Sequence, residues 1–244
     1  MSITLIQIEN QPIVRAEIDG AEPLSGELIT QLGKALDQAE DLGPSAIMLV
    51  HVVGRVSPAA LHPWPGQSDT QSVNKWERVL RRIERAGPTT VALVERACSA
   101  LALELLLVTD RRLAIGGFSV QSATPGADLW PGMAIYRLSR QLGEARARKV
   151  FLDATEITAE LGLQLNIIDE TVDDWASGVD RIGHLMKHAP LDDFAVRRRL
   201  MQDSLCTSFD DALGAHLAAC DRALRRSPAS GRDFATAQAV ASAV

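Results

Sequence analysis

The sequence predicts an α/β protein built around a largely parallel β-sheet. Short runs rich in Val and Ile alternate with amphipathic helical segments over most of the first 172 of its 244 residues. Two of these runs, Ala46–Val53 and Thr89–Val94, are almost continuously apolar, which is typical of strands buried on both faces. Strands that alternate with helices imply βαβ crossovers, and these join parallel neighbours.

The first elements follow from periodicity and turn residues. Two short strands are predicted at Ile3–Ile8 and Pro12–Ile18, with a polar turn between them. A helix is predicted from Ser25, whose hydroxyl can cap it, to Leu42, because apolar residues recur there at helical spacing. Residues 54–70 are predicted to form a loop, because three prolines and two glycines interrupt any regular structure.

The later elements are predicted in the same way. A helix is expected over Gln71–Ala86, and the apolar stretch Cys98–Thr109 is predicted to be a buried helix. Further strands are expected at Arg112–Ile115, at Phe118–Gln121 and at Ile167–Glu170. The remainder of the chain is predicted to be mostly helical.

Three regions are expected along the chain. Residues 1–172 carry the alternating strands and helices and are predicted to form the core domain. Residues 173–226 are predicted to be a helical C-terminal region. The tail, residues 227–244, is rich in Ala, Ser and Gly and is predicted to be loosely held.

Composition excludes several classes of function. The net charge of −6 argues against a nucleic-acid partner, since phosphate binding depends on clustered Lys and Arg. Three cysteines follow no metal-ligand spacing, so we expect no metal and a reduced, cytoplasmic protein. No signal peptide is recognisable, and no apolar run approaches the ~20 residues of a membrane helix, so no membrane association is expected.

Glu104 is the most informative residue, because it is the single charged side chain in the segment Ala97–Val108. A helix that is apolar on every side is buried, and an unpaired carboxylate inside it must find a partner, face a cleft or raise its pKa. A raised pKa suits a general acid or base at neutral pH. The free N–H groups of the first helical turn can also bind an oxyanion. The open alternative is a structural Glu104 that pairs with an arginine such as Arg111 or points to water.

The segment that runs from strand Thr89–Val94 through Glu104 to Asp110 resembles the crotonase (enoyl-CoA hydratase/isomerase) superfamily. The resemblance covers most of residues 24–172 and includes these further motifs: Leu113-Ala114, Pro131-Gly132, Gly143-Glu144-Ala145-Arg146-Ala147 and Ile167-Ile168-Asp169-Glu170. It implies the ClpP/crotonase-like fold, in which ββα units stack and a helical C-terminal region assembles a homotrimer or hexamer. It also implies an acyl-CoA thioester as substrate, so that coenzyme A enters with the substrate and no other cofactor is required.

Within the superfamily, the chain looks most like the hydratase-like proteins of 3,5-dihydroxyphenylglycine biosynthesis. The residues that carry this likeness are Lys75-Trp76-Glu77-Arg78, Trp130-Pro131-Gly132-Met133 and the stretch from Thr207 to Asp221. It implies an acyl-CoA dehydratase, hydratase or isomerase that assists a type III polyketide synthase in forming 3,5-dihydroxyphenylacetyl-CoA. The alternative is a catalytically degenerate partner that stabilises or activates the synthase.

The resemblance assigns two carboxylate positions. Glu104 matches the first catalytic glutamate of the hydratases, whereas the second falls on Thr124, which does not ionise near pH 7. The usual two-carboxylate addition of water is therefore not expected in its standard form. Asp128, in the same predicted loop, is a candidate substitute for the missing carboxylate, and the alternative is an exposed turn residue.

The oxyanion hole is also expected to depart from the family pattern. Leu101 takes the position of a glycine, and its backbone N–H remains available. The other donor position falls on Pro58, which has no N–H, or on Ala59 if the alignment slips by one residue.

Several tryptophans and one arginine are further candidates for substrate binding. Trp64 and Trp130, together with Trp76, can line an acyl or aromatic pocket, although ordinary core packing is the alternative for each. Arg55 can meet a coenzyme A phosphate, with an unengaged surface charge as the alternative.

Other polar residues have simpler interpretations. Ser99 starts the buried helix where a related peptidase fold places its nucleophile, but no motif selects a histidine partner, and we interpret Ser99 as the helix N-cap. His51 and His62 can approach the pocket, but a core histidine and a loop histidine are the preferred interpretations.

Overall fold

The computed structural model describes residues 1–8, 11–121, 130–153, 155–188 and 194–226. They belong to two compact units, Met1–Ala195 and Val196–Val244, which are considered separately below. Two of the predicted site residues, Thr124 and Asp128, lie outside the described residues.

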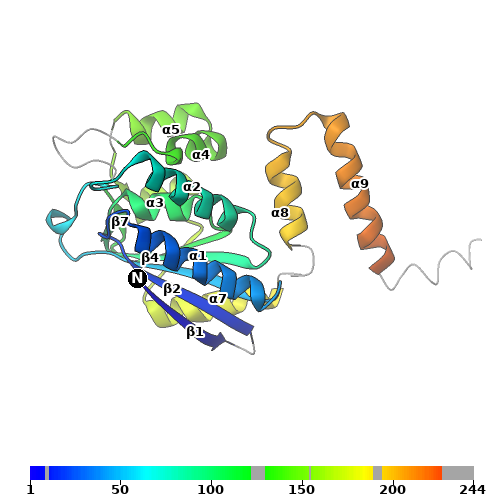
Figure 1. Ribbon diagram of the computed structural model, residues 1–244, viewed down its shortest axis with the longest axis horizontal. Coiled ribbons are helices and arrows are strands. Elements are labelled where there is room, and N and C mark those ends of the chain that lie inside the picture. Colours follow the sequence, from blue (N-terminus) through cyan, green and yellow to red (C-terminus); the bar gives the residue numbers. More distant parts are fainter. Residues whose placement is uncertain (9–10, 122–129, 154, 189–193, 227–244) are drawn as a thin grey trace, which may run out of the picture. The chain divides into compact units, whose positions relative to one another are not determined.

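The first unit begins with β1, which is dark blue in Figure 1. It is built on a six-stranded sheet with the strand order β1-β2-β3-β4-β6-β9. Its strands are β1 (Ser2–Ile8), β2 (Gln11–Asp19), β3 (Ile47–Val53), β4 (Thr89–Glu95), β6 (Arg111–Ile115) and β9 (Glu170–Val172). Only the β1–β2 pair in this sheet is antiparallel, and the other neighbours are parallel, as the sequence predicts. A second, three-stranded sheet contains β5 (Ala97–Cys98), β7 (Ser119–Val120) and β8 (Ile157–Thr158).

Helices connect and cover these strands. They are α1 (Gly26–Asp41), α2 (Thr70–Glu84), α3 (Ala100–Leu106), α4 (Met133–Leu142), α5 (Glu144–Phe151), α6 (Ala159–Gln164) and α7 (Trp175–His188). The predicted cap of α1 is confirmed, because Ser25 Oγ accepts a hydrogen bond from Leu28 N at 3.1 Å. Asp69 caps α2 in the same way, accepting from Ser72 N at 2.6 Å.

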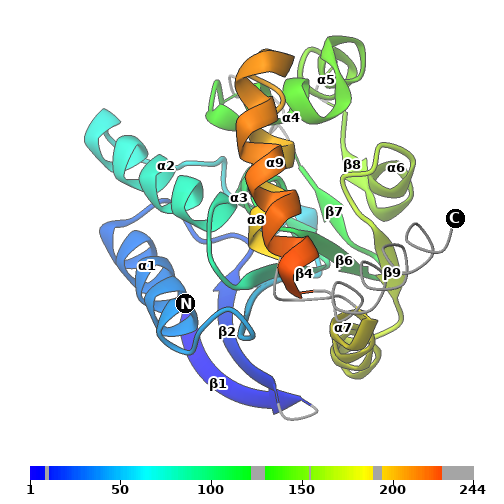
Figure 2. The ribbon, with the colours of Figure 1, turned by 90° about the vertical axis from the view of Figure 1, so that its right-hand side faces the viewer.

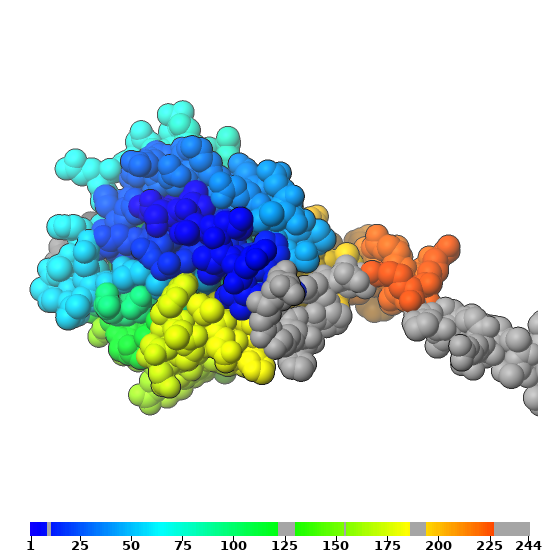
Figure 3. All heavy atoms as spheres, turned by 90° about the horizontal axis from the view of Figure 1, so that it is seen from below, coloured from blue at the N-terminus to red at the C-terminus, as the bar shows by residue number. Residues whose placement is uncertain are grey.

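The two faces of the main sheet pack against different helices. Alternate residues of β3, such as Val50 and Val52, belong to the large core that also contains α1, α2 and α3. Their neighbours Ile47 and Leu49 face the other way, into a smaller core that contains Ile182 of α7. Figure 2 shows α7 set apart from α1, α2 and α3, with the strands between them. In Figure 3, the yellow residues that include α7 lie beside the dark blue first strand. The sheet therefore separates two environments.

The loop after β3 is held against the segment that precedes α3. Arg55 N donates to Ala97 O at 2.7 Å, and Ala97 N donates to Arg55 O at 3.1 Å. Gly54 makes this approach possible, because a Cβ at this position would lie 2.3 Å from Ala97 O. The end of β3 and the start of α3 are thereby fixed side by side.

The region around α3 differs in detail from the prediction. The predicted helix Cys98–Thr109 is shorter, because Ala97 and Cys98 pair with β7 as strand β5 before α3 begins at Ala100. The predicted strand Ile167–Glu170 is shifted, and β9 occupies Glu170–Val172. Local apolar patterns could not reveal either difference, since both depend on pairing with distant strands.

The second unit contains α9 (Phe209–Arg226) and most of α8 (Phe194–Asp203). Among the described residues of α9, none is buried, and Phe209, Leu213, Leu217 and Leu224 are exposed at roughly helical spacing. Across the described parts of both units, no helix combines the length and the apolar character needed to cross a membrane.

Candidate active site

Glu104 lies in the middle of α3 and is 1% exposed. Its Oε2 accepts a hydrogen bond of 2.6 Å from the indole Nε1 of Trp76, which belongs to α2 and is also buried. Within the described part of the chain, Glu104 forms no ion pair, so the alternative in which Arg111 neutralises it is not observed. Arg111 instead contributes to lowering the pKa of Glu170. Among the residues that the structure describes, Glu104 is thus a buried carboxyl group without a direct counter-charge.

Burial raises the pKa of Glu104 to about 7, because the apolar surroundings penalise the charged form. The Trp76 N–H opposes this pKa shift by favouring the carboxylate, and the nearby charge of Glu77 adds to it. Trp64 and Arg137 favour the carboxylate more weakly. The apolar sequence around Glu104 predicts this direction, and the value lies where one group can both take up and release a proton.

Gly132, immediately before α4, packs against the other oxygen of the same carboxyl group. A Cβ on Gly132 would lie 2.7 Å from Glu104 Oε1 and 2.3 Å from Trp130 Nε1. No side chain larger than hydrogen fits there unless Glu104 or Trp130 moves. The start of α4 therefore closes the carboxyl site opposite Trp76.

Arg137 fixes α4 against α2. Its guanidinium contacts Glu77 Oε2 at 2.9 Å and Glu84 Oε1 at 2.8 Å, and its side chain is 6% exposed. A cation close to the Glu104 site is therefore already engaged by two other carboxylates. This arrangement positions Gly132 and leaves Glu104 unneutralised.

A cavity of about 420 Å³ lies next to the tryptophans near Glu104, although Glu104 itself does not line it. Trp64, Trp130 and Pro131 line it, together with Pro65, Gly66, Ser68, Asp69, Thr70 and Val73. The ring of Trp64 packs edge-on against that of Trp76, with the ring centroids 5.6 Å apart. Two of the tryptophans singled out in the sequence thus line one cavity, and they connect it to Glu104.

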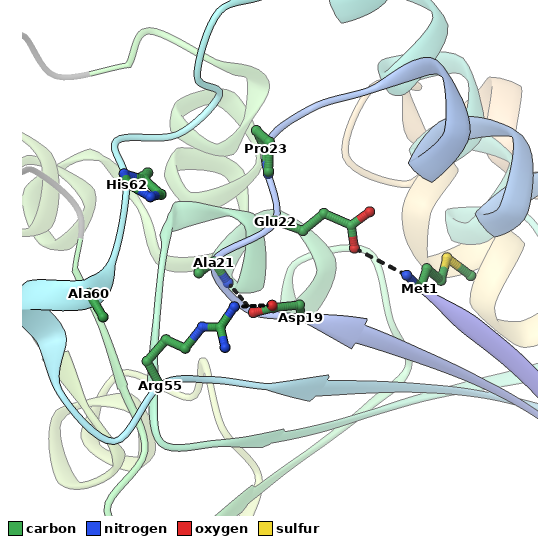
Figure 4. Close-up of a pocket in the computed structure, with 8 residues that line it drawn as sticks. All are labelled: Met1, Asp19, Ala21, Glu22, Pro23, Arg55, Ala60 and His62. Atoms are coloured by element: carbon green, nitrogen blue, oxygen red, sulfur yellow. Dashed lines mark hydrogen bonds and ion pairs between the residues drawn. The ribbon is translucent and has the colours of Figure 1, made fainter.

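A second cavity has a volume of about 530 Å³, and Figure 4 shows the residues that line it. It is lined by Met1, Asp19, Ala21, Glu22, Pro23, Arg55, Ala60 and His62. Arg55 points across it to an ion pair with Asp19. The hydrogen bond from Leu24 N to Pro65 O, 3.0 Å long, joins the segment after β2 to the loop that carries Trp64. Arg55 is therefore an engaged cation rather than an isolated surface charge.

The candidate oxyanion donors lie in two different settings. Leu101 is fully buried in the first turn of α3, and its N–H makes no hydrogen bond to another described residue. Pro58 and Ala59 lie in an exposed 3-10 turn, Pro58–Ala60, with the proline at its start. The donor on the α3 side is available, and the donor on the loop side stays a prediction.

Two other polar residues singled out in the sequence, His51 and Ser99, occupy positions that suit structural roles. His51 faces the α7 side of the sheet, where it stacks on Trp175, accepts from Arg15 and contacts Glu95 Oε1 at 3.0 Å. The preferred interpretation, a core histidine, is confirmed, and an approach to the Glu104 pocket is not observed. Ser99 occupies the N-cap position of α3, but its hydroxyl makes no capping hydrogen bond. Within the described residues, no group of three or more His, Cys, Asp or Glu side chains is placed to hold a metal ion.

Comparison with known proteins agrees with this architecture. The chain is 40% identical over 213 residues to an enoyl-CoA-hydratase from Amycolatopsis orientalis, and the match covers 87% of this chain and 96% of the relative. No family model matches the sequence.

Solved structures extend the agreement to the fold. An enoyl-CoA hydratase/isomerase family protein from Silicibacter pomeroyi superposes with a TM-score of 0.74 at 16% identity, covering 92% of this chain and 99% of that one. An enoyl-CoA hydratase/isomerase from Mycobacterium abscessus superposes with a TM-score of 0.72 at 19% identity. This match covers 97% of this chain and 94% of that one. An enoyl-CoA hydratase/isomerase from Marinobacter aquaeolei superposes with a TM-score of 0.72 at 12% identity, and the match covers 97% of this chain and 96% of that one. The chain belongs to the crotonase (enoyl-CoA hydratase/isomerase) superfamily.

Proposed function

We propose that the protein is an acyl-CoA dehydratase/hydratase or isomerase in which Glu104 is the general acid and base. The observation that carries this proposal is the buried carboxyl group with a pKa of about 7, adjacent to an aromatic-lined cavity of about 420 Å³. A lone carboxyl group at such a pKa is suited to removing a proton beside a thioester carbonyl and returning it.

The dehydration of a β-hydroxyacyl thioester needs one proton carrier in this scheme. The Glu104 carboxylate takes the proton from the carbon next to the thioester carbonyl, and the electron pair moves to the carbonyl oxygen. The carbonyl then re-forms, the carbon–carbon double bond appears and the bond to the β-hydroxyl breaks. Glu104 returns its proton to the departing hydroxide, which leaves as water. Isomerisation uses the same two proton transfers at different carbons.

Backbone donors stabilise the charge that develops on the thioester oxygen. The free N–H of Leu101 lies in the first turn of α3, the helix that carries Glu104, so one element can supply a donor and the proton carrier. Removing one such donor typically costs about 2.7–4 kcal/mol of transition-state stabilisation. An oxyanion hole that lacks its second donor at Pro58 would therefore give slow turnover.

The larger cavity is the proposed site of the coenzyme A portion. Arg55 lines it and can exchange its ion pair with Asp19 for a phosphate of the nucleotide. Because Asp19 and Glu22 also line this cavity, phosphate binding depends on that exchange. An Arg55→Ala variant should bind coenzyme A esters more weakly with little change in turnover at saturation.

The proposed biological setting is aromatic polyketide formation. Two of the motifs that resemble the dihydroxyphenylglycine proteins supply Trp76 and Trp130-Pro131-Gly132, and these residues surround Glu104. Aromatic walls suit a planar, unsaturated acyl group. On this basis the protein would assist a type III polyketide synthase in forming 3,5-dihydroxyphenylacetyl-CoA.

The decisive experiment replaces Glu104 by Gln, which keeps the shape and removes the proton carrier. Product formation in the synthase-coupled reaction, and dehydration of a model β-hydroxyacyl-CoA, should fall about 10²–10⁴-fold, while acyl-CoA binding is retained. Unchanged rates and products with Glu104→Gln would eliminate the proposed catalysis.

A second candidate function is that of a non-catalytic partner of the synthase. The burial of the Glu104 carboxyl group favours it, because little of that group is open to a substrate. Glu104 is 1% exposed, and Gly132 packs against its free oxygen. This candidate predicts a complex with the synthase that persists in the Glu104→Gln variant. Sedimentation at micromolar concentration would detect that complex, and its absence would count against this role.

We also propose assembly into a homotrimer or hexamer. The exposed apolar residues of α9, from Phe209 to Leu224, form a stripe that another copy of the chain can cover. Phe209→Ser with Leu217→Ser should lower the mass measured by light scattering to that of a smaller species.

A further inference from the structure

The structure separates the proposed proton carrier from the cavity in which an acyl group would bind. Glu104 is 1% exposed, and it does not belong to the residues that line the cavity of about 420 Å³. A general acid or base must come within about 2.6–3.2 Å of the group whose proton it moves. In this conformation that contact cannot form, so a side chain has to move before the proposed reaction starts.

Two tryptophan side chains lie between Glu104 and this cavity. Trp64 and Trp130 both line the cavity. Trp130 Nε1 and Glu104 Oε1 border the same small space at Gly132. The ring of Trp64 packs against Trp76, whose N–H donates to Glu104 Oε2. Trp64 is the more deeply buried of the two, so movement of its ring would join the carboxyl group to the cavity.

The ring of Trp64 is held less firmly than that of Trp76. Trp76 is 2% exposed, and its N–H donates to Glu104 Oε2 at 2.6 Å. The N–H of Trp64 is buried without a hydrogen-bond partner among the described residues, so rotation of this ring breaks no hydrogen bond there. A buried structural tryptophan usually has an acceptor for its N–H. One side of the Trp64 ring also borders the cavity, which gives the ring room to turn.

The backbone on either side of Trp64 is fixed, so the movement is confined to the side chain. Pro65 O accepts a hydrogen bond from Leu24 N at 3.0 Å. Gly66 N donates to Pro63 O at 2.9 Å and closes a turn around Trp64. The turn therefore holds the Cα of Trp64 in place while its ring changes from one rotamer to another.

We propose that Trp64 is a gate residue, whose ring closes the passage from the cavity to Glu104 and turns aside when an acyl group enters. The acyl group then takes the place of the ring and brings its α-carbon to the carboxyl group. The inference rests on the proposed function, because it requires acyl chemistry at Glu104. It explains how a carboxyl group that is almost completely buried acts on a substrate. Trp64 itself moves no proton.

Removal of the ring tests the closed state without a substrate. A water-soluble carbodiimide with an amine nucleophile labels the carboxyl groups that it can reach, and peptide mass spectrometry gives the labelling rate at Glu104. Trp64→Val should label Glu104 several times faster than the wild-type protein does. Trp64→Phe keeps a ring at this position and should restore slow labelling. Equal rates in the wild type and Trp64→Val would overturn the inference and leave the proposed function standing.

Two controls separate an opened gate from a loosened fold. Trp175→Val removes the same ring from the other face of the sheet and should leave the labelling rate at Glu104 unchanged. Within Trp64→Val, the rate at Asp110, which accepts hydrogen bonds from Thr90, should stay at its wild-type value. Faster labelling at Glu104 and Asp110 alike would mean that Trp64 is a structural residue, and it would contradict the inference.

The titration of Glu104 gives a second readout of the same variant. Burial is the main cause of its raised pKa, so water that enters in Trp64→Val should lower this pKa from about 7. Loss of the Trp64 N–H acts in the opposite direction, but it is one of the weaker influences on Glu104. A pKa that stays near 7 in Trp64→Val would show that the ring does not close the site.

A crystal structure of the wild-type protein with 3-phenylpropionyl-CoA covers the case in which Trp64→Val does not fold. This saturated ester has no β-hydroxyl group to lose as water, so it stays intact. The Trp64 ring should adopt a different rotamer, and the acyl group should contact Glu104. A ligand that reaches Glu104 while Trp64 keeps its position would overturn the inference and leave the proposed function standing. A ligand that binds away from Glu104, or does not bind, would refute both.

Discussion

Glu104 and His51 are two buried ionisable groups on opposite sides of one sheet, and they differ in their partners. Burial is the main cause of both pKa shifts: it raises that of Glu104 to about 7 and lowers that of His51 to about 4. His51 lies between Arg15 and Glu95, so each ring nitrogen has a partner. Glu104 has one indole donor and no counter-ion among the described residues.

Burial alone therefore does not distinguish a candidate proton carrier from a structural residue. Desolvation moves both residues toward their neutral forms. Of the two residues, Glu104 alone has a pKa near physiological pH, and it lies beside Trp64, which lines the smaller cavity. Burial, with the charge of Arg15 adding to it, lowers the pKa of His51 to about 4 and keeps the ring neutral near pH 7, which suits a structural role. The following predictions test this distinction.

The largest effect is expected for Arg137→Met. This change leaves Glu77 and Glu84 without their shared cation, and breaking such a buried pair costs about 3 kcal/mol of the free energy of unfolding. Urea denaturation measures it. Arg199→Met, which removes an exposed ion pair with Asp203, should cost less than about 0.5 kcal/mol.

The same variant also tests whether Arg137 is a hidden counter-ion of Glu104. Because Arg137 is the weakest of the named influences on the pKa of Glu104, its removal should raise that pKa only slightly. A large rise in the pKa of Glu104 would show that the two residues are directly coupled.

The next largest effect is expected for Gly132→Ala. The added methyl group would lie 2.7 Å from Glu104 Oε1, so the carboxyl group or α4 must move. A displacement of about 1 Å at a reacting group can cost about 10²-fold in rate. Turnover of a β-hydroxyacyl-CoA measures the loss. Gly33→Ala is the matched control, because nothing lies within 4 Å of a Cβ there, and its rate should not change.

Opposite pH trends in stability should follow from the two groups. The pKa of Glu104 is higher in the folded state than in the unfolded chain. Its contribution to the free energy of unfolding is therefore complete below about pH 4.5 and is lost as the pH rises through about 7. The pKa of His51 is lower in the folded state, so its contribution is complete above about pH 6.5 and is lost as the pH falls toward about 4. Between about pH 4.5 and 6.5, these trends oppose each other.

Single variants should expose each trend, by at most about 1.4 kcal/mol per pH unit. Relative to wild type, Glu104→Gln should gain stability as the pH rises over this interval, and His51→Leu should lose it. Urea denaturation at pH 4.5, 5.5 and 6.5 gives the differences. Identical profiles for the three proteins would mean that neither group titrates as described.

The smallest effect is expected for Trp76→Phe. The ring remains but the N–H that stabilises the carboxylate is lost, so the pKa of Glu104 should rise further. The rising limb of the pH–rate profile should move to higher pH. A shift to lower pH would show that Trp76 does not favour the charged form.

The sequence predicted the parallel sheet, the buried helix and the burial of Glu104, because these depend on local patterns. A single carboxylate among apolar residues is visible without coordinates. The contacts of Glu104 with Trp76 and Gly132 were not predicted, since each residue is 28 positions away and only the fold brings them together.

The side of the sheet that His51 faces was also left open. In β3 every residue but one is apolar, so the alternation that separates the two faces of a strand is hidden. The short strand β5 could not be predicted either, because its two residues are defined only by pairing with β7.

The most direct test is titration of the Glu104 side-chain carboxyl carbon by ¹³C NMR, with the signal assigned by its loss in Glu104→Gln. We expect a midpoint near pH 7, because Glu104 is buried without a counter-ion among the described residues. A midpoint near 4.5, the ordinary value for a glutamate, would mean that the group is charged throughout the physiological range and would contradict its assignment as the acid and base of this site.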